Sequence, residues 1–301
     1  MYDIIIIGAG PAGLTAAIYA KRASKSCLIL EAKSFGGQIV NTPDIENYPT
    51  AEHMAGFEFA MKLYTQAINL GAELKFERAL SIEKSQSSWT VKTAQNAYEA
   101  KAVIIATGAE NRKLGVAREE DLTGKGVSYC ATCDGAFYKG KTVAVVGGGN
   151  TAFEDAEYLA DIAERVYLIH RRDSFRADAS SVEKLRAKAN VEFILNANVT
   201  ALLSEQKLTG VEVTYRSGQT ETLAVEALFV AVGRIPENGS FADVIALDDE
   251  GYAVAGENCL TRAAGIFVAG DNRQKELRQL VTATADGAVA ATAAVKYINA
   301  Q

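Results

Sequence analysis

Short apolar runs that each end at a glycine or a charged residue dominate the hydrophobic pattern of this chain. The first covers residues 3–7, where four isoleucines follow Asp3. A continuous apolar run of this kind is typical of a strand that is buried on both faces of a parallel sheet. Residues 14–20 form an alanine-rich segment of helical character, and residues 27–30 form a second apolar run. The pattern therefore predicts a β-α-β unit at the start of the chain.

A glycine-rich turn, Gly8-Ala9-Gly10-Pro11-Ala12-Gly13, joins the first strand to the helix. Its glycines occupy the G-x-G-x-x-G positions, which allow a tight turn and let backbone N–H groups approach a pyrophosphate at the helix N-terminus. Glu31 ends the second strand, where a carboxylate can accept a hydrogen bond from a ribose hydroxyl. Strand, turn, helix and terminal acid together predict dinucleotide binding. The alternative is that Glu31 is only a solvated strand end.

The same arrangement occurs a second time. An apolar strand, a glycine turn, a helical segment and a returning strand follow one another at residues 141–146, 147–152, 153–162 and 166–169. The first glycine of the turn and the residue after the second strand are 23 positions apart in both copies (31 − 8 and 170 − 147). Ala152 replaces the third glycine, which the fingerprint permits. The chain thus contains two copies of one nucleotide-binding unit.

The two copies differ at the end of the second strand. Where the first has Glu31, the second has His170, Arg171 and Arg172, with Arg176 close behind. A carboxylate repels a 2′-phosphate, whereas guanidinium groups bind one bidentately. We therefore expect NADPH in the second unit and a different dinucleotide, FAD, in the first. The alternative is a basic surface loop at the start of a helix.

Three further apolar segments end at a glycine, at residues 102–108, 227–233 and 265–271. The first two each follow their own nucleotide unit, and the third ends in Gly270-Asp271, whose carboxylate suits the ribityl or phosphate region of a flavin. Residues 280–298 then suit a helix rich in alanine and threonine. Alternating segments, such as residues 89–93 and 210–215, predict antiparallel strands of smaller sheets.

These segments predict an α/β fold with two Rossmann-like dinucleotide-binding domains of three layers, one inserted in the other. The C-terminal strand has no nucleotide unit of its own, so we group it with the first unit. The expected FAD-binding domain comprises residues 1–112 and 245–301. The expected NADPH-binding domain comprises residues 113–244.

A C-x-x-C-D motif at residues 130–134 lies just ahead of the second glycine turn. Two thiols at this spacing can close and reopen a small disulfide, the thiolate being the attacking species, and the adjacent carboxyl group can donate or accept a proton. The alternative is half of a zinc site, which usually needs four cysteine or histidine ligands. The chain has two other cysteines, Cys27 and Cys259, and two histidines, and none of these forms a second close pair. We therefore expect no metal and assign redox catalysis to Cys130, Cys133 and Asp134.

Composition narrows the class of protein. The chain has 301 residues, of which 49% are hydrophobic and 23% charged, with a net charge of −6. This balance suits a globular protein with a sizeable core and gives no general electrostatic case for nucleic-acid binding. Four cysteines in a chain of this length suit a reducing compartment. The first residues lack a basic leader and no apolar run reaches a membrane-spanning length, so we expect a cytoplasmic protein without membrane attachment.

Along essentially its whole length, the chain resembles the bacterial low-molecular-weight thioredoxin reductases, which are class II pyridine nucleotide-disulfide oxidoreductases. The combination of motifs is far more specific than any one of them. The motifs are Gly8–Gly13, Gly36-Gly37-Gln38, Glu46-Asn47-Tyr48-Pro49, Cys130–Asp134, Gly147–Ala152, His170-Arg171-Arg172 with Arg176, and Gly270-Asp271 followed by Arg278-Gln279.

The resemblance implies which residues contact the two cofactors. Those expected to contact FAD are Gly8, Gly10, Ala12, Gly13, Glu31, Gly37, Gln38, Asn47, Asp271, Arg278 and Gln279. Those expected to contact NADPH are Gly149, Asn150, Thr151, His170, Arg171, Arg172 and Arg176.

The resemblance also implies a route for the electrons. Hydride would pass from the nicotinamide to the flavin, which would reduce the Cys130–Cys133 disulfide. Cys133 would face the flavin, Cys130 would attack the disulfide of thioredoxin, and Asp134 would serve as general acid and base. Members of this family are usually homodimers, so we expect a homodimer here.

Two predicted loops depart from the family pattern. Residues 115–120 lack the proline and, beyond Gly115, the glycine that are common there, and Thr50 stands where glycine is common. We expect these differences to leave the chemistry unchanged and to affect either the stiffness of the connections between the two domains or partner docking.

Other functions remain open at this stage. A related flavoprotein could serve another disulfide carrier, such as a peroxiredoxin system or a glutaredoxin-like protein, although a fused thioredoxin-like domain would favour that role and this chain has none. A redox sensor could use the cysteine pair to report NADPH status without turnover. A flavoprotein that passes electrons from NADPH to ferredoxin fits poorly, because it does not need the cysteine pair.

Overall fold

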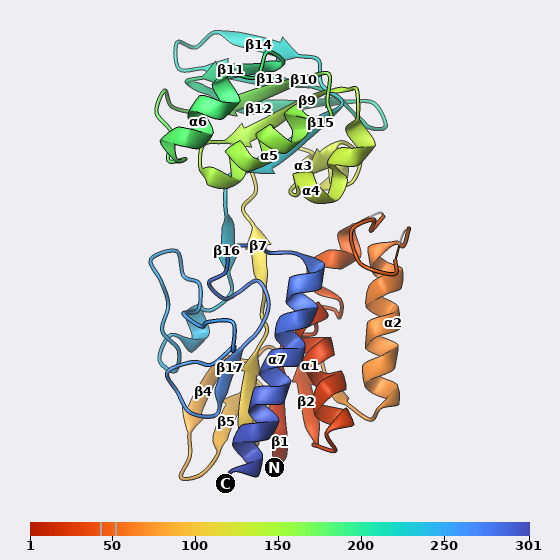
Figure 1. The fold of residues 1–301 in the computed structure, drawn as a ribbon, viewed down its shortest axis with the longest axis vertical. Helices are drawn as coiled ribbons and strands as arrows, with labels where there is room; N and C mark the ends of the chain where they lie inside the picture. Colours follow the sequence, from red (N-terminus) through yellow and green to blue (C-terminus); the bar gives the residue numbers. More distant parts are fainter. Residues whose placement is uncertain (43, 52) are drawn as a thin grey trace. The chain divides into compact units, whose positions relative to one another are not determined.

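The computed structural model describes residues 1–42, 44–51 and 53–301. They divide into two compact units (Figure 1), one made of residues 1–110 with 235–301 and the other of residues 111–234. The expected α/β class, with two Rossmann-type units, is confirmed by the parallel sheet in each of them. Within the part of the chain that the structure describes, no helix has the length and apolar character needed to cross a membrane.

The first unit is built on a seven-stranded sheet. Its path is β3-β2-β1-β6-β5-β4, with β17 paired to β6. Strands β1, β2, β3, β6 and β17 run parallel, whereas β4 and β5 form an antiparallel extension. The strands are β1 (Tyr2–Ile7), β2 (Cys27–Leu30), β3 (Glu73–Lys75), β4 (Ser81–Lys84), β5 (Trp89–Lys92), β6 (Ala97–Ile105) and β17 (Ile266–Val268). The helices and 3-10 turns are α1 (Pro11–Arg22), η1 (Gly37–Asn41), α2 (Gly56–Asn69), η3 (Gly239–Phe241) and α7 (Leu280–Asn299).

Strand β1 shows why an unbroken apolar run is needed at the centre of this sheet. Ile4 and Ile6 pack on one face with α1 and α7, whereas Ile5 and Ile7 pack on the other face. Because successive side chains of a strand point to opposite faces, a strand covered on both sides must be apolar at every position.

The second unit combines a parallel and an antiparallel sheet. The parallel sheet has the order β11-β10-β9-β15-β8, and the antiparallel sheet the order β12-β13-β14. The strands are β8 (Val127–Ser128), β9 (Thr142–Gly147), β10 (Arg165–His170), β11 (Val191–Leu195), β12 (Ala197–Ser204), β13 (Leu208–Tyr215), β14 (Thr220–Leu223) and β15 (Ala227–Ala231). The helices are α3 (Glu119–Leu122), α4 (Ala131–Asp134), the 3-10 turn η2 (Gly135–Tyr138), α5 (Asn150–Ala160) and α6 (Ala179–Arg186).

The chain passes between the units twice, and the two passages pair with each other as strands β7 (Ala109–Asn111) and β16 (Arg234–Pro236). The first passage lies two residues before the expected boundary at residue 112. The second lies at 234/235, ten residues before the expected boundary at 244/245. The reason is packing: Phe241 and Ile245 are buried in the core of the first unit.

Candidate active site

The first glycine turn is shaped by close backbone contacts. Gly8 has a φ of +107°, and a Cβ there would lie 2.3 Å from the carbonyl oxygen of Ala106. A Cβ on Gly13 would lie 1.9 Å from the carbonyl oxygen of Gly8. Only glycine therefore fits at these two positions. By contrast, the space above Gly10 is open except for Gly37, whose Cα lies 3.9 Å away from the Cβ position. The turn thus leaves room for a ligand at the N-terminus of α1.

Glu31 is held beside this turn, at the end of β2. Its Oε2 accepts a hydrogen bond from the Ala9 N–H at 2.7 Å, and its Oε1 accepts one from the Lys33 N–H at 2.8 Å. The carboxylate is therefore not a freely solvated strand end. It stands next to the backbone where a dinucleotide ribose would be expected.

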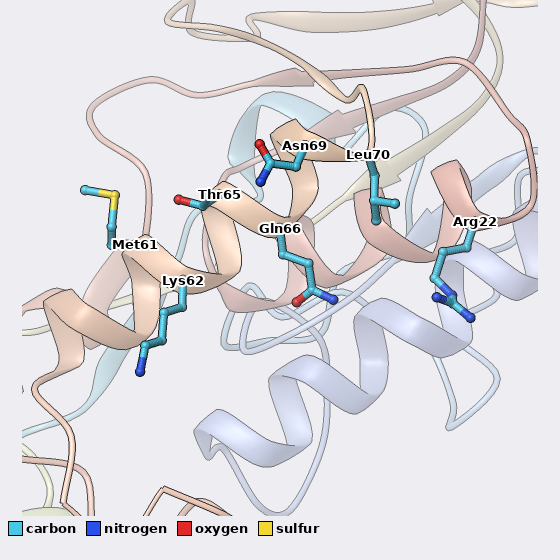
Figure 2. Close-up of a pocket in the computed structure, with 7 residues that line it drawn as sticks. All are labelled: Arg22, Met61, Lys62, Thr65, Gln66, Asn69 and Leu70. Carbon is cyan, nitrogen blue, oxygen red and sulfur yellow. The ribbon is translucent and has the colours of Figure 1, made fainter.

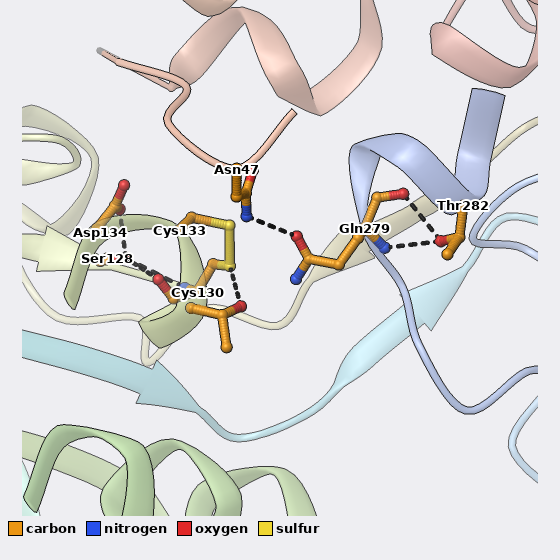
Figure 3. Close-up of a disulfide and its surroundings, with 8 residues drawn as sticks. Asn47, Ser128, Cys130, Cys133, Asp134, Gln279 and Thr282 are labelled. Carbon is orange, nitrogen blue, oxygen red and sulfur yellow. Dashed lines mark hydrogen bonds between the residues drawn. A yellow bond between two sulfur atoms is a disulfide. The ribbon is translucent and has the colours of Figure 1, made fainter. Parts of the chain in front are cut away.

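The remaining residues expected at the flavin come from three other segments of the first unit. Gly37 and Gln38 begin η1, and Gln38 is exposed. Asn47 Nδ2 donates a hydrogen bond to Gln279 Oε1 at 3.2 Å (Figure 3), so these two expected contacts lie together. Gln279 is also the N-cap of α7, where it forms a capping box with Thr282.

Arg278 precedes that cap. Its guanidinium lies 4.0 Å from the centre of the Tyr252 ring, and its Nε is buried with no hydrogen-bond partner among the described residues. A buried donor without a partner is costly, so an acceptor from a ligand would complete this site. The open glycine turn and this donor fit an anionic dinucleotide.

The second glycine turn has a similar shape in the second unit. A Cβ on Gly147 would lie 2.3 Å from the Ala231 carbonyl oxygen, whereas nothing lies within 4 Å of a Cβ on Gly149, the N-cap of α5. Thr151 is exposed in the first turn of that helix. Asn150 bonds to Asp178, the N-cap of α6: the Asn150 Oδ1 accepts a hydrogen bond from the Asp178 N–H at 2.9 Å.

His170 and the arginines have different surroundings. The His170 ring lies directly under Gly148, where a Cβ would approach within 2.1 Å, and its Nε2 is 3.1 Å from the Ser174 carbonyl oxygen. Burial lowers the pKa of His170, so the ring is mainly neutral at pH 7. Its position supports the turn. Arg171, Arg172 and Arg176 are exposed, and the Arg176 N–H donates to the Gly148 carbonyl oxygen at 2.8 Å.

The cysteine motif forms a disulfide at the start of α4 (Figure 3). Cys130 is the N-cap of this short helix and is joined to Cys133. The Ser128 hydroxyl donates to Asp134 Oδ2 at 2.6 Å and accepts from the Cys130 N–H at 3.1 Å. Burial raises the pKa of Asp134, against the effect of the Ser128 hydrogen bond. Asp134 is thus placed to hold a proton four residues from Cys130 and next to Cys133.

Two residues near this motif were not identified from the sequence. Ser128 lies two residues before Cys130, and a serine close to a C-x-x-C motif carries no specific signal. Asp155 lies on α5 and accepts a hydrogen bond from the backbone of Ala131, between the two cysteines. Burial raises the pKa of Asp155 to about 7, and Arg234 opposes that shift. What sets Asp155 apart is its position on the inward face of α5, and the sequence alone does not reveal which face of the helix is inward.

Two surface features lie apart from these residues. A hollow of about 530 Å³ lies against α1 and α2 (Figure 2) and contains none of the expected site residues. Among the described residues, one group of three offers ligand atoms within 4.8 Å of one another, namely Asp44, Glu46 and His53, and each is at least partly exposed.

Comparison with known proteins agrees with this geometry. The model of the family described as pyridine nucleotide-disulphide oxidoreductase matches residues 2–287. A thioredoxin reductase of Listeria monocytogenes is 43% identical over 99% of this chain and 94% of its own length. A thioredoxin reductase of Treponema pallidum is 42% identical, over 99% of this chain and 97% of its own length.

A solved structure shows the same similarity in three dimensions. The thioredoxin reductase from Streptococcus pyogenes superposes with a TM-score of 0.96 at 42% identity, covering 100% of this chain and 99% of the other. The family match and the full-length relatives agree with the two dinucleotide turns and the disulfide of the structure. The chain therefore belongs to the pyridine nucleotide-disulphide oxidoreductase family and is an enzyme of that class.

Proposed function

We propose that this protein is a thioredoxin reductase that passes electrons from NADPH through FAD to the Cys130–Cys133 disulfide and on to the disulfide of thioredoxin. The observation that carries the proposal is the disulfide itself, placed beside a half-buried acid in a unit that also has a dinucleotide turn. The relatives that match over the full chain bear the same name.

FAD is assigned to the first unit, and when bound it supplies a two-electron carrier between a nicotinamide and a disulfide. The open turn at Gly10 and the buried Arg278 Nε support this assignment. The residues proposed to hold FAD are Gly8, Gly10, Ala12, Gly13, Glu31, Gly37, Gln38, Asn47, Asp271, Arg278 and Gln279.

NADPH is assigned to the second unit. Gly149 is the N-cap of α5, and Asn150 and Thr151 are its first residues; the N–H groups at this helix N-terminus suit a pyrophosphate. The exposed guanidinium groups of Arg171, Arg172 and Arg176 suit a 2′-phosphate. For His170 the half-buried position under Gly148 favours a supporting role over a direct contact with the phosphate.

The thiol chemistry follows from the motif. Two electrons and two protons open the Cys130–Cys133 bond to two thiols. The Cys130 thiolate then attacks one sulfur of the thioredoxin disulfide, and Cys133 attacks the resulting mixed disulfide, which restores the original bond and releases thioredoxin as a dithiol. Asp134 holds the proton that the departing sulfur needs, and Ser128 orients its carboxyl group.

Two further properties are part of the proposal. We place the enzyme in the cytoplasm, because a reducing compartment keeps its thioredoxin substrate turning over. We also propose a homodimer, as the resemblance implies.

The test is a turnover assay. Purified protein reconstituted with FAD should oxidise NADPH in the presence of a bacterial thioredoxin disulfide, and Cys130→Ser should lose this activity while its flavin is still reduced by NADPH. Activity with a glutaredoxin but with no thioredoxin would replace the proposed substrate by another disulfide carrier. NADPH binding without turnover of any disulfide would support a sensor instead.

A further inference from the structure

A buried carboxylate, Asp286 on α7, is the centre of a compact charge cluster in the first unit. Its Oδ2 accepts hydrogen bonds from the Gly270 N–H at 2.9 Å, Arg273 Nε at 2.8 Å and Lys275 Nζ at 2.9 Å. Its Oδ1 accepts one from Arg273 Nη2 at 2.7 Å. The side chains of Arg273, Lys275 and Asp286 are 2%, 4% and 6% exposed.

All the donors come from one segment, residues 270–279, which connects β17 to α7. This segment contains three of the residues proposed to contact FAD, namely Asp271, Arg278 and Gln279. The Gly270 bond holds its start, and the Arg273 and Lys275 bonds hold its middle. Arg278 Nη2 in turn donates to the Arg273 carbonyl oxygen at 3.5 Å. Asp286 therefore ties the start and the middle of the segment to α7, whereas Asn272 and Gln274 bond to other parts of the first unit.

The helix that carries this acceptor is fixed against the first glycine turn. A Cβ on Gly287, the residue after Asp286, would lie 2.2 Å from the Ala12 carbonyl oxygen in α1. A Cβ on Gly270 would lie 2.9 Å from the Ala12 Cβ. Because α1 begins at the glycine turn, α7 and Asp286 hold the 270–279 segment in a set position relative to that turn.

The charges of the cluster do not balance within the interior. Two cations and one carboxylate are enclosed, whereas Glu257, which accepts from Arg273 Nη2 at 3.2 Å, is 89% exposed. Burial opposes ionisation of Asp286, but hydrogen bonds from Arg273 and Lys275 hold its pKa below the usual value. The interior therefore retains a surplus positive charge, which favours a nearby anion because it is screened weakly.

We propose that Asp286 is a positioning residue for the flavin: its carboxylate fixes the 270–279 segment against the first glycine turn and so prepares the site that receives the dinucleotide. This inference rests on the proposed function, since it takes FAD as the ligand of the first unit.

The experiment measures FAD binding to the apoprotein by quenching of flavin fluorescence. Asp286→Asn keeps the shape but removes the charge. The enclosed cations therefore lose their counter-ion, and the segment loses one of its two acceptor oxygens. We expect the Kd for FAD to rise by about tenfold or more. Glu257→Gln is the matched control, because it neutralises the exposed carboxylate on the same arginine, and we expect a change of less than about twofold.

If Asp286→Asn does not fold, a second variant tests the same proposal. Lys275→Met removes one cation but retains the Arg273–Asp286 pair, and we expect it to fold and to raise the Kd for FAD by about three- to tenfold. Binding of 2′,5′-ADP to the second unit should be unchanged in every variant, which shows that any loss is confined to the flavin site.

The outcomes separate the two proposals. A folded Asp286→Asn variant, or in its absence Lys275→Met, that binds FAD as tightly as the wild type would overturn the positioning role alone. A wild-type apoprotein that binds no FAD would overturn the proposed function and this inference with it.

Discussion

At the redox motif, the most informative residue is Asp134, because its surroundings favour the protonated form of its carboxyl group. Burial raises the pKa of Asp134, and its Oδ2 accepts the Ser128 hydroxyl at 2.6 Å. A raised pKa lets a carboxylic acid donate its proton closer to neutral pH than an exposed aspartate can. The local structure therefore agrees with the acid role that the resemblance implies.

Asp134→Asn should lower thioredoxin turnover by about 10²-fold or more, because a positioned general acid contributes roughly that factor. Reduction of the flavin by NADPH should change less than about twofold, since that step does not use the acid. Stopped-flow absorbance resolves both steps. In the wild type, thioredoxin turnover should also fall as the pH rises through the raised pKa of Asp134, and the variant should lack this limb. An unchanged pH profile in the variant would remove Asp134 from the chemistry.

Asp155 predicts a pH effect on stability. Its pKa is raised from 3.8 to about 7, chiefly by burial. A raised pKa in the folded state means that the contribution of the protonated group is fully present below about pH 4, the unfolded value, and is lost as the pH rises towards 7. Relative to Asp155→Asn, the free energy of unfolding of the wild type should fall by at most about 1.4 kcal/mol per pH unit across this range.

Urea denaturation at several pH values between 4.5 and 8 measures that difference. Asparagine can still accept the Ala131 N–H, so the comparison isolates the charge. Two parallel curves would show that Asp155 does not titrate in this window.

At the scale of secondary-structure elements, glycines set how closely α1 and α7 approach. The two helices lie side by side in the first unit (Figure 1), and Gly287 faces the backbone of α1 at Ala12. Such a contact leaves no room for a methyl group, and a rigid helix pair relaxes only at a cost.

Gly287→Ala should therefore lower the free energy of unfolding by about 1–3 kcal/mol, despite the better helix propensity of alanine. Thermal denaturation followed by circular dichroism measures the change. Ala285→Ser, on the exposed side of the same helix, is the control and should change stability by less than about 0.5 kcal/mol. A stable Gly287→Ala protein would show that the two helices can separate without loss.

The segment after β10 carries the nucleotide preference. Replacing both Arg171 and Arg176 by glutamine should lower kcat/KM for NADPH by about 10–100-fold, because hydrogen bonds to charged groups contribute roughly 1.5–3 kcal/mol. The kcat/KM for NADH should change less than about threefold. Arg165→Gln removes an exposed charge at the other end of β10 and serves as the control. Equal losses for both nucleotides would mean that the arginines do not recognise the 2′-phosphate.

At the scale of the whole molecule, repetition within the sequence made the fold predictable. Two glycine turns at equal spacing from the end of the next strand predicted two nucleotide-binding units, and the structure confirms a parallel sheet in each. The helix predicted over residues 153–162 begins earlier, at Asn150, because its N-terminal turn is part of the glycine motif. Local patterns of this kind can be recognised in a sequence because the strand, the turn and the helix that form the pattern lie in one short segment.

The features that sequence did not predict depend on contacts between distant segments. The structure divides at 234/235, ten residues before the expected 244/245, because Phe241 and Ile245 are buried against a sheet that is formed mostly from residues far earlier in the chain. The cluster around Asp286 was missed for a similar reason: Arg273 and Lys275 follow no periodic pattern and resemble surface residues until the segment folds back on α7. The cofactor contacts inferred from resemblance remain predictions.

The central claim is that the cysteine pair exchanges electrons with a flavin, and an anaerobic NADPH titration followed at the flavin absorption band tests it most directly. Wild-type protein should take up about two equivalents of NADPH per flavin, one for the cofactor and one for the disulfide, and Cys133→Ser should take up about half as much. If both proteins bleach after the same amount of NADPH, the disulfide lies outside the electron path and the proposed reductase activity is contradicted.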